Sequence, residues 1–261
     1  GVKVGQRVWG CNWHEPPEQG TCAELLCTDQ NWVYPLDGNV SFQTAAALAL
    51  VGITAHLGLV REAGLRSGET VFVNGGSGSV GSAVVQMAKA IGATVITTAG
   101  SESKADSCRE FGADAVIEYK RESLREGIRT HAPQGVDVWF DVTRSPDLEV
   151  AVHSLAQDGR LIVISGREAS SAFPVGPFYV KCCRMSGFQL TLAAPEDRRA
   201  AALDMNRWMS EGRLKANIAH VLPLSQIADA HRLQEEMTLS QSSASSGKIV
   251  LNVGATPYPL S

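Results

Sequence analysis

Two hydrophobic periodicities organise this chain of 261 residues. From residue 70 onward, short apolar runs typical of buried strands alternate with segments whose apolar residues recur at helical spacing. The runs that predict strands are 71–73, 94–98, 115–118, 136–141 and 160–165. The segments that predict helices between them are 80–91, 102–111, 122–131 and 146–155. This alternation predicts an α/β fold, with a doubly wound parallel sheet covered by helices on both faces.

The residues on either side of this region have different patterns. Short alternating runs at 2–9, 20–26 and 31–35 predict strands of a β-rich domain. A helical stretch follows at 41–66, where Ser41 is the expected N-cap, Gly52 an interruption and Gly64 the end. Beyond the alternating region, 173–184 is irregular and 241–247 is a serine-rich loop. Further strands are expected at 187–192, 218–221 and 248–253, and further helices at 195–209 and 225–237. We therefore expect one domain over 41–214 and a second, β-rich domain formed by 1–40 and 215–261.

Composition narrows the possible partners. The net charge is −4 and no basic run is present, which argues against nucleic acid and against an anionic membrane surface. Polar or charged residues interrupt each apolar stretch, so we expect no membrane-spanning segment. The six cysteines are scattered through apolar or helical segments of a long chain. Free thiols, and hence a reducing compartment such as the cytoplasm, are the better interpretation.

The segment 70–81, TVFVNGGSGSVG, carries the main chemical signal of the chain. Gly76, Gly78 and Gly81 have the spacing G-x-G-x-x-G, with a predicted strand before them and a predicted helix after them. Glycine allows a sharp turn and the close approach of a pyrophosphate, and the helix N-terminus supplies N–H groups and a positive dipole end. The pattern therefore predicts a dinucleotide site. The alternative is a glycine-rich turn that only packs the helix on the strand.

The end of the strand at 94–98 indicates which dinucleotide is bound. An NAD site normally has an acidic residue there, which holds the ribose 2′-hydroxyl. This chain has TTAGS at 97–101 instead, and Lys104 follows one helical turn later. Small and hydroxyl residues leave room for a 2′-phosphate, and a lysine can reach it as a point charge. NADPH is therefore favoured over NADH, unless Lys104 is only a solvated surface residue.

Several of these motifs together resemble the medium-chain dehydrogenase/reductase superfamily. They are GITA at 52–55, the glycine loop, AGSESK at 99–104 and GADAVIEY at 112–119. Within it, the chain is most similar to the zinc-independent quinone oxidoreductases, the branch that includes ζ-crystallin. The resemblance implies a Rossmann domain plus part of a GroES-like β-barrel, whose first strands would be missing from this sequence. It also implies a homodimer, often joined through an edge strand, here 187–192.

The resemblance also implies cofactor-binding roles at matching positions. Gly78, Ser79, Val80 and Gly81 match the pyrophosphate loop, and Gly100, Ser101 and Lys104 match the 2′-phosphate site. Tyr119 matches a side chain near that phosphate or the adenine, and Val142 and Thr143 lie beside the adenosine half. Positions near the nicotinamide and its ribose are matched by Thr54, Ser165, Gly166, Phe188 and Leu190. For each residue the alternative is a packing or capping role.

The sequence argues against a catalytic zinc. Zinc alcohol dehydrogenases of the superfamily carry a ligand cysteine just before the G-x-T motif, where this chain has Leu50. They also carry a four-cysteine lobe, where this chain has a short loop at 12–19. A site made of Cys11, His14, Cys22 and Cys27 is the alternative, but ordinary thiols fit the expected strands better.

No general acid or base stands out, since His56, His153 and Asp141 lie where structural roles are expected. The sequence thus predicts an enzyme in which NADPH passes a hydride to a quinone or another electron-poor alkene or carbonyl. One alternative is a reductase of enones or enoyl thioesters, and a second is a structural protein that binds NADPH with little turnover. A third is a zinc alcohol dehydrogenase, which Leu50 disfavours.

Overall fold

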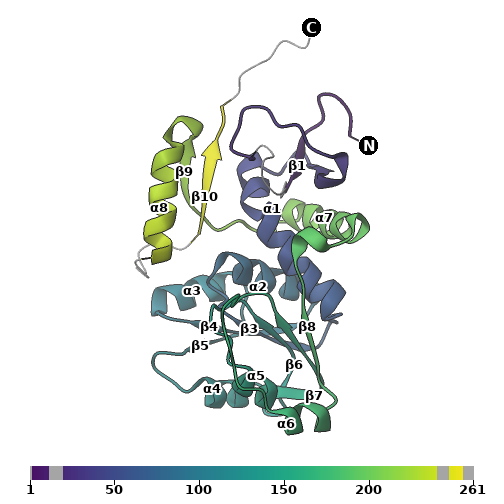
Figure 1. Ribbon diagram of the computed structural model, residues 1–261, viewed down its shortest axis with the longest axis vertical. Helices are drawn as coiled ribbons and strands as arrows, with labels where there is room; N and C mark the ends of the chain where they lie inside the picture. Colours follow the sequence, from purple (N-terminus) through teal and green to yellow (C-terminus); the bar gives the residue numbers. More distant parts are fainter. Residues whose placement is uncertain (1, 12–19, 240–246, 255–261) are drawn as a thin grey trace. The chain divides into compact units, whose positions relative to one another are not determined.

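A computed structural model describes residues 2–11, 20–239 and 247–254 (Figure 1). The chain divides into two compact units. One is Val51–Lys215, and the other combines Gly1–Leu50 with Ala216–Ser261.

The Val51–Lys215 unit contains a six-stranded sheet in the order β5-β4-β3-β6-β7-β8, and every neighbouring pair is parallel. The strands are β3 (Thr70–Asn74), β4 (Thr94–Ala99), β5 (Ala115–Glu118), β6 (Val136–Asp141), β7 (Leu155–Val163) and β8 (Arg184–Gly187). The chain leaves β3 toward β4 and β5, then crosses back to β6 on the other side of β3. This reversal creates a crevice at the carboxyl ends of β3 and β6, where open α/β sheets bind ligands.

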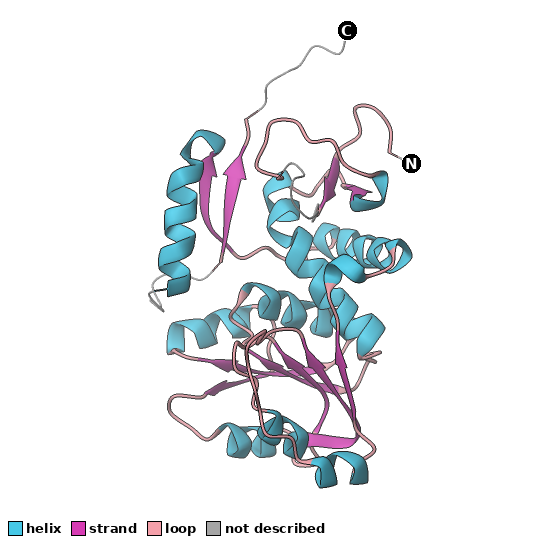
Figure 2. Cartoon of the chain, viewed as in Figure 1, coloured by secondary structure: helices cyan, strands magenta, loops and turns pink. Residues whose placement is uncertain are grey.

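Helices cover both faces of this sheet, which confirms the predicted α/β class (Figure 2). In Figure 1, α2 (Ser79–Ile91) and α3 (Glu102–Glu110) lie on one face. The opposite face carries α4 (Leu124–His131), α5 (Leu148–Ser154) and α6 (Val175–Val180). The chain continues into α7 (Pro195–Ser210).

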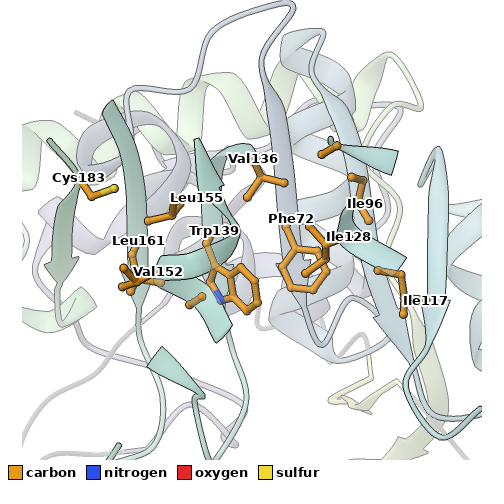
Figure 3. Close-up of a cluster of buried hydrophobic side chains, with 12 residues drawn as sticks. Phe72, Ile96, Ile117, Ile128, Val136, Trp139, Val152, Leu155, Leu161 and Cys183 are labelled. Carbon is orange, nitrogen blue, oxygen red and sulfur yellow. The ribbon is translucent and has the colours of Figure 1, made fainter. Parts of the chain in front are cut away.

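A cluster of buried apolar side chains lies between the sheet and α4 and α5 (Figure 3). Phe72 and Trp139 come from adjacent strands, and their ring centroids are 4.2 Å apart. Ile128 of α4 and Val152 of α5 pack on the same cluster. Each such side chain contributes about 1.5–3 kcal/mol by leaving water, so this core fixes the strand ends that carry the candidate site.

The long helix after residue 41 differs from its prediction at Gly52. Ser41 caps it as expected, since its Oγ accepts a hydrogen bond from the Thr44 amide at 3.0 Å. However, α1 runs unbroken over Phe42–His56 and continues as a π-helical segment, Leu57–Glu62. A Cβ on Gly52 would collide with the Met205 side chain of α7. This glycine therefore permits close helix packing and does not end the helix.

The stretch Phe42–Glu62 is also more apolar than the sequence analysis assumed. It is 21 residues long, with a mean hydropathy of 1.6, so it meets the length and composition of a membrane span. The prediction that no stretch does so was wrong. Of its most apolar window, 67% is buried inside the protein, as in the core helix of a soluble protein.

The predicted edge strand at 187–192 is also wrong. The edge strand on this side of the sheet is β8, of which only Gly187 falls in that range, and Leu190–Leu192 forms a 3-10 turn. The preceding stretch, expected to be irregular, contains α6. Any pairing of two copies through this edge would therefore use Arg184–Gly187.

The unit formed by Gly1–Leu50 and Ala216–Ser261 contains two small sheets. The first pairs β1 (Val8–Gly10) with β2 (Val33–Pro35) antiparallel, and the second pairs β9 (Ile218–Pro223) with β10 (Lys248–Asn252) parallel. Helix α8 (Ile227–Leu239) packs on the second sheet. The predicted strand at 20–26 is wrong, because these residues form bends in which Leu25 is 63% exposed. The run at 2–9 is a strand only from Val8. The loops expected at 12–19 and at 241–246 lie outside the described residues.

A partly buried ion pair joins the start of β3 to β7. The Arg160 guanidinium donates to both Glu69 carboxylate oxygens at 3.0 and 2.7 Å, and the Arg66 amide donates to the same carboxylate at 2.8 Å. Burial alone would raise the pKa of Glu69, but the hydrogen bonds and charge of Arg160 outweigh it, so the pKa is lowered. The ionised form of Glu69 therefore stabilises the folded state.

Replacing Glu69 with glutamine is expected to lower the melting temperature at pH 7 by about 2–8 °C, the equivalent of about 1–2 kcal/mol. Because the folded pKa is depressed, the stabilisation is present above the unfolded pKa of about 4.3 and is lost as the pH falls through the folded pKa. The gap between the two melting curves should therefore close in acid. Thermal melts between pH 3 and 7 test this, with Glu110→Gln on the exposed end of α3 as the control. A gap that is the same at pH 3 and pH 7 would contradict it.

Candidate functional site

The glycine loop joins β3 to α2 in a tight turn. Gly75 has a φ of +99°, and Gly78 is the N-cap of α2. A Cβ on Gly81 would collide with the Gly75 carbonyl, and a Cβ on Gly76 with the Thr97 hydroxyl. The loop therefore lies directly on the first turn of α2, where Ser79 and Val80 begin the helix. Helix N-termini with such close backbone access bind phosphate groups.

Two threonines of β4 hold this loop in place. The Thr97 hydroxyl donates to the Val73 carbonyl at 2.7 Å. The Thr98 hydroxyl donates to Asn74 Oδ1 at 3.2 Å and accepts from the Gly75 amide at 2.9 Å. From the sequence, these threonines were predicted only to leave space for a phosphate. Their hydrogen bonds also fix the turn itself.

Asp141 links the ends of β3 and β6. Its carboxylate is 1% exposed and accepts hydrogen bonds from Asn74 Nδ2 at 2.9 Å and from Trp139 Nε1 at 3.0 Å. The amide and the hydroxyl of Thr143 donate to it at 2.9 and 2.6 Å. A buried carboxylate with this many donors organises the crevice at the switch point. No role was predicted for Asn74, although a polar residue between an apolar strand and a glycine loop is a signal for one.

A cavity of about 350 Å³ lies at the carboxyl ends of β3, β4 and β6, and we call it the Lys104 cavity. It brings together four of the residues assigned by resemblance, namely Gly100, Lys104, Tyr119 and Thr143. The Ser101 hydroxyl caps α3 by accepting from the Lys104 amide at 3.4 Å. The Tyr119 hydroxyl lies only 2.6 Å from where a Cβ on Gly100 would be, so this glycine lets the tyrosine lie over the loop.

The charge of Lys104 is not neutralised locally. No ion pair or hydrogen bond of its ammonium group is found in the described part of the chain. The one carboxylate that lines the cavity, Asp147, caps α5 by accepting from the Val150 amide at 3.0 Å. The cavity thus presents a lysine to whatever occupies it.

A second cavity, of about 790 Å³, lies at the carboxyl ends of β7 and β8, and we call it the Ser165 cavity. Ser165, Gly166 and Phe188 line it, as do Arg144 and Arg167. Ser145 lines both cavities, so the two are neighbours along the sheet edge.

The Phe188 ring at the Ser165 cavity is held by its neighbours. The Arg61 guanidinium lies 5.3 Å from the ring centroid. A Cβ on Gly58 would be 3.3 Å from the ring and would collide with Phe140. Arg61 in turn pairs with Glu62 at 2.7 Å. Phe188 is therefore a fixed apolar wall of the cavity.

Other residues assigned by resemblance lie outside both cavities. Val142 lies against Gly75, and its amide donates to the Asn74 carbonyl at 3.2 Å. Leu190 is buried in its 3-10 turn, and Thr54 is half-buried in α1. The glycine loop residues 78–81 lie at the start of α2.

The two histidines considered as acid or base lie away from both cavities. His56 is buried, and its Nε2 lies 3.0 Å from Asp204 Oδ2. Burial lowers the pKa of His56, although Asp204 opposes the shift. His153 is exposed at the end of α5.

Within 2–11, 20–239 and 247–254, no group of three or more potential metal ligands is found. His14 lies outside these ranges. Cys11 is buried, Cys22 and Cys27 are exposed, and all six cysteines are free thiols. Leu50 offers no ligand atom.

Known proteins are similar to this chain over much of its length. Residues 79–207 match the family model "Zinc-binding dehydrogenase". Prostaglandin reductase 1 of Rattus norvegicus is 35% identical over 176 residues, which cover 64% of this chain and 54% of that protein. The chain thus spans about half the length of the prostaglandin reductases it matches.

Quinone oxidoreductase of Rattus norvegicus is 31% identical over 233 residues, which cover 89% of this chain and 69% of that protein. Among solved structures, the quinone oxidoreductase of Thermus thermophilus, also described in complex with NADPH, superposes with a TM-score of 0.76. It is 27% identical and is matched over 97% of this chain and 79% of its own.

Proposed function

This chain belongs to the medium-chain dehydrogenase/reductase superfamily, and we propose that it is an NADPH-dependent, zinc-independent oxidoreductase of the quinone reductase type. It would transfer a hydride to a quinone or to another electron-poor alkene or carbonyl. The observation that carries the proposal is the Lys104 cavity, where a lysine without a partner in the described chain and a tyrosine meet beside the glycine loop. In this proposal residues 1–40 and 215–261 form the substrate domain, and the protein is a cytoplasmic homodimer.

The residues present fit a dinucleotide. Gly76 and Gly81 lack the Cβ atoms that would collide with Thr97 and with the Gly75 carbonyl, so the loop turns tightly onto the N-terminus of α2. Residues 78–81 would hold the pyrophosphate, and Gly100, Ser101 and Lys104 the 2′-phosphate. The end of β4 carries no acidic side chain. A carboxylate there would repel the 2′-phosphate of NADPH and would hydrogen-bond the ribose 2′-hydroxyl of NADH.

The nicotinamide end would lie at the Ser165 cavity. Bound NADPH would supply the hydride. The residues of this chain would bind and orient the cofactor and the substrate, and would exclude water from the site. Ser165 and Gly166 would lie beside the ring, with Phe188 as an apolar wall. Thr54, Val142, Thr143, Tyr119 and Leu190 would complete the cofactor site, as the family resemblance implies.

Oxidation of NADPH by the purified full-length protein with 9,10-phenanthrenequinone tests the proposal. We expect turnover of the quinone, and we expect it to survive removal of metal by dialysis against EDTA, because Leu50 supplies no zinc ligand. Metal analysis of the same sample is the control. Loss of turnover on chelation that zinc restores would contradict zinc independence. NADPH binding without turnover of any acceptor would indicate a structural role.

A second candidate is an enone or enoyl thioester reductase, favoured by the similarity to prostaglandin reductase 1. It differs from the first in its acceptor only. The ratio of kcat/KM for 1-octen-3-one to that for the quinone separates them, since an enone reductase should prefer the enone.

A further inference from the structure

Two exposed arginines, Arg144 and Arg167, line the Ser165 cavity. We propose that Arg144 and Arg167 bind a carboxylate of the substrate, so that this enzyme selects acidic enones or quinones over neutral ones. The inference rests on the proposed function, because it places the substrate at the nicotinamide end.

The fold brings the two arginines to one cavity from adjacent strands. Arg144 follows β6 and Arg167 follows β7, which pair in parallel up to Asp141 and Val163. The two loops are also packed on each other. A Cβ on Gly166, whose φ is +85°, would be 2.9 Å from Pro146 Cδ and 3.1 Å from the Arg144 carbonyl.

A hydrogen bond further along the chain joins the same two loops. The Ser171 hydroxyl accepts from the Leu148 amide at 2.9 Å, which joins the loop after β7 to the first turn of α5. The Ala169 amide donates a hydrogen bond to the Gly166 carbonyl at 2.8 Å, which forms a turn. The loops are therefore ordered, and both arginines line the cavity from fixed backbone positions.

No described residue of the protein neutralises the charges of Arg144 and Arg167. Neither side chain has an ion pair or hydrogen bond with another described residue. Glu168 lines the same cavity, so two cations face one anion there. The remaining polar lining groups, Ser145, Ser165 and Gln189, are neutral.

The dipole of helix α5 does not favour Arg144 either. Arg144 lies three residues before Asp147, the N-cap of α5, where the dipole disfavours positive charge. A lysine at the amino ends of the strands provides a contrast. There, Lys181 donates to the carbonyls of Val152, His153 and Leu155 at 2.6–3.2 Å, and so caps the end of α5. Lys181 has a structural partner, whereas Arg144 and Arg167 are left for a ligand.

A carboxylate matches this arrangement. The guanidinium fork binds carboxylates through two parallel hydrogen bonds, which a single ammonium cannot do. The phosphates of the cofactor have their own proposed contacts at α2 and Lys104, on the other side of Ser145. The arginines are therefore available to the substrate.

The test compares substrates that differ only in this charge. They are 5-oxohept-6-enoic acid and 9-oxoundec-10-enoic acid, each against its methyl ester. We expect the wild-type protein to favour the acid of at least one pair in kcat/KM by roughly five- to 20-fold, with the ratio falling as salt is added. In the double variant Arg144→Gln/Arg167→Gln the ratio should fall to about one, and lysine at both positions should restore part of it.

Arg125→Gln is the matched control, because Arg125 is exposed on α4 and lines neither cavity of the candidate site. It should keep the wild-type ratio. Equal kcat/KM for acid and ester at both chain lengths would overturn the inference. So would a double variant that keeps its acid preference but binds NADPH more weakly, since the arginines would then serve the cofactor.

A binding measurement separates this inference from the proposed function. Calorimetry with the protein saturated in NADP⁺ gives dissociation constants for the saturated products, 5-oxoheptanoic and 9-oxoundecanoic acids, and for their methyl esters. Acid selectivity that the double variant loses would support the arginine site even if no enone is turned over. Absence of turnover would then count against the reductase activity alone. Equal binding of acid and ester would overturn the site.

Discussion

Replacing Lys104 with alanine is expected to raise the dissociation constant of NADPH by about 10- to 100-fold, which is the loss of about 1.5–3 kcal/mol of charge-assisted binding. The dissociation constant of NADH should change by less than about twofold, because a ribose 2′-hydroxyl offers Lys104 no charge. Lys104 is well placed for this discrimination. It lines the cavity beside Gly100 and Tyr119, and the fixed start of α3 positions it there. Quenching of protein fluorescence by each nucleotide measures both constants.

Two further variants make this result specific. Lys104→Arg keeps the charge and should keep most of the preference for NADPH. Lys120→Ala removes an exposed lysine that does not line the cavity, and it should leave both constants unchanged. Equal weakening of NADPH and NADH by Lys104→Ala would mean that the lysine shapes the site without recognising the phosphate. No weakening of either would make it an ordinary surface charge.

Local patterns were enough to predict the parallel sheet. The strands from β3 to β6 begin and end within about two residues of their predicted limits, because a buried parallel strand is an uninterrupted apolar run. The errors occur where a distant segment decides the local structure. Gly52 was expected to break its helix, and only the position of Met205, 153 residues later, shows that it serves packing instead.

The short alternating run at 20–26 failed for a related reason. An alternating pattern shows that a strand is possible, but the strand also needs a neighbour to bond with. In the described structure the pairing partner of β1 is β2, and 20–26 pairs with neither.

In the candidate site, too, the local features were predicted and the features that join distant segments were not. The glycine loop and Lys104 were predicted because strand, turn and helix follow one another within a few residues. The network around Asp141 was not predicted, because Asn74 and Asp141 are 67 residues apart in sequence. Arg144 and Arg167 were missed because each is an unremarkable loop arginine alone. The packing of Gly166 on Pro146 and the hydrogen bond between Leu148 and Ser171 show that their loops lie together.

The Asp141 network leads to the largest expected effect on stability. Asp141→Asn keeps the shape of the side chain but replaces one acceptor oxygen with an NH₂ group. That group would face donors from Asn74 and Trp139 or from Thr143, whichever way the amide is turned. The variant should therefore lose about 3 kcal/mol of folding free energy, because buried donors are left unpaired and the remaining bonds lose their charge assistance.

A loss of this size corresponds to a fall in melting temperature of about 6–12 °C. Asp137→Asn is the matched control on the same strand, because the Asp137 side chain accepts from the Thr70 amide at 2.7 Å and has no other hydrogen bond within the described structure. It should cost about 1 kcal/mol. Asp141→Asn should also weaken NADPH and NADH binding together, since the network holds the Asn74–Gly75 turn but touches no 2′-phosphate. This common weakening distinguishes Asp141 from Lys104. Equal melting temperatures for the two aspartate variants would show that the switch-point crevice does not depend on this carboxylate.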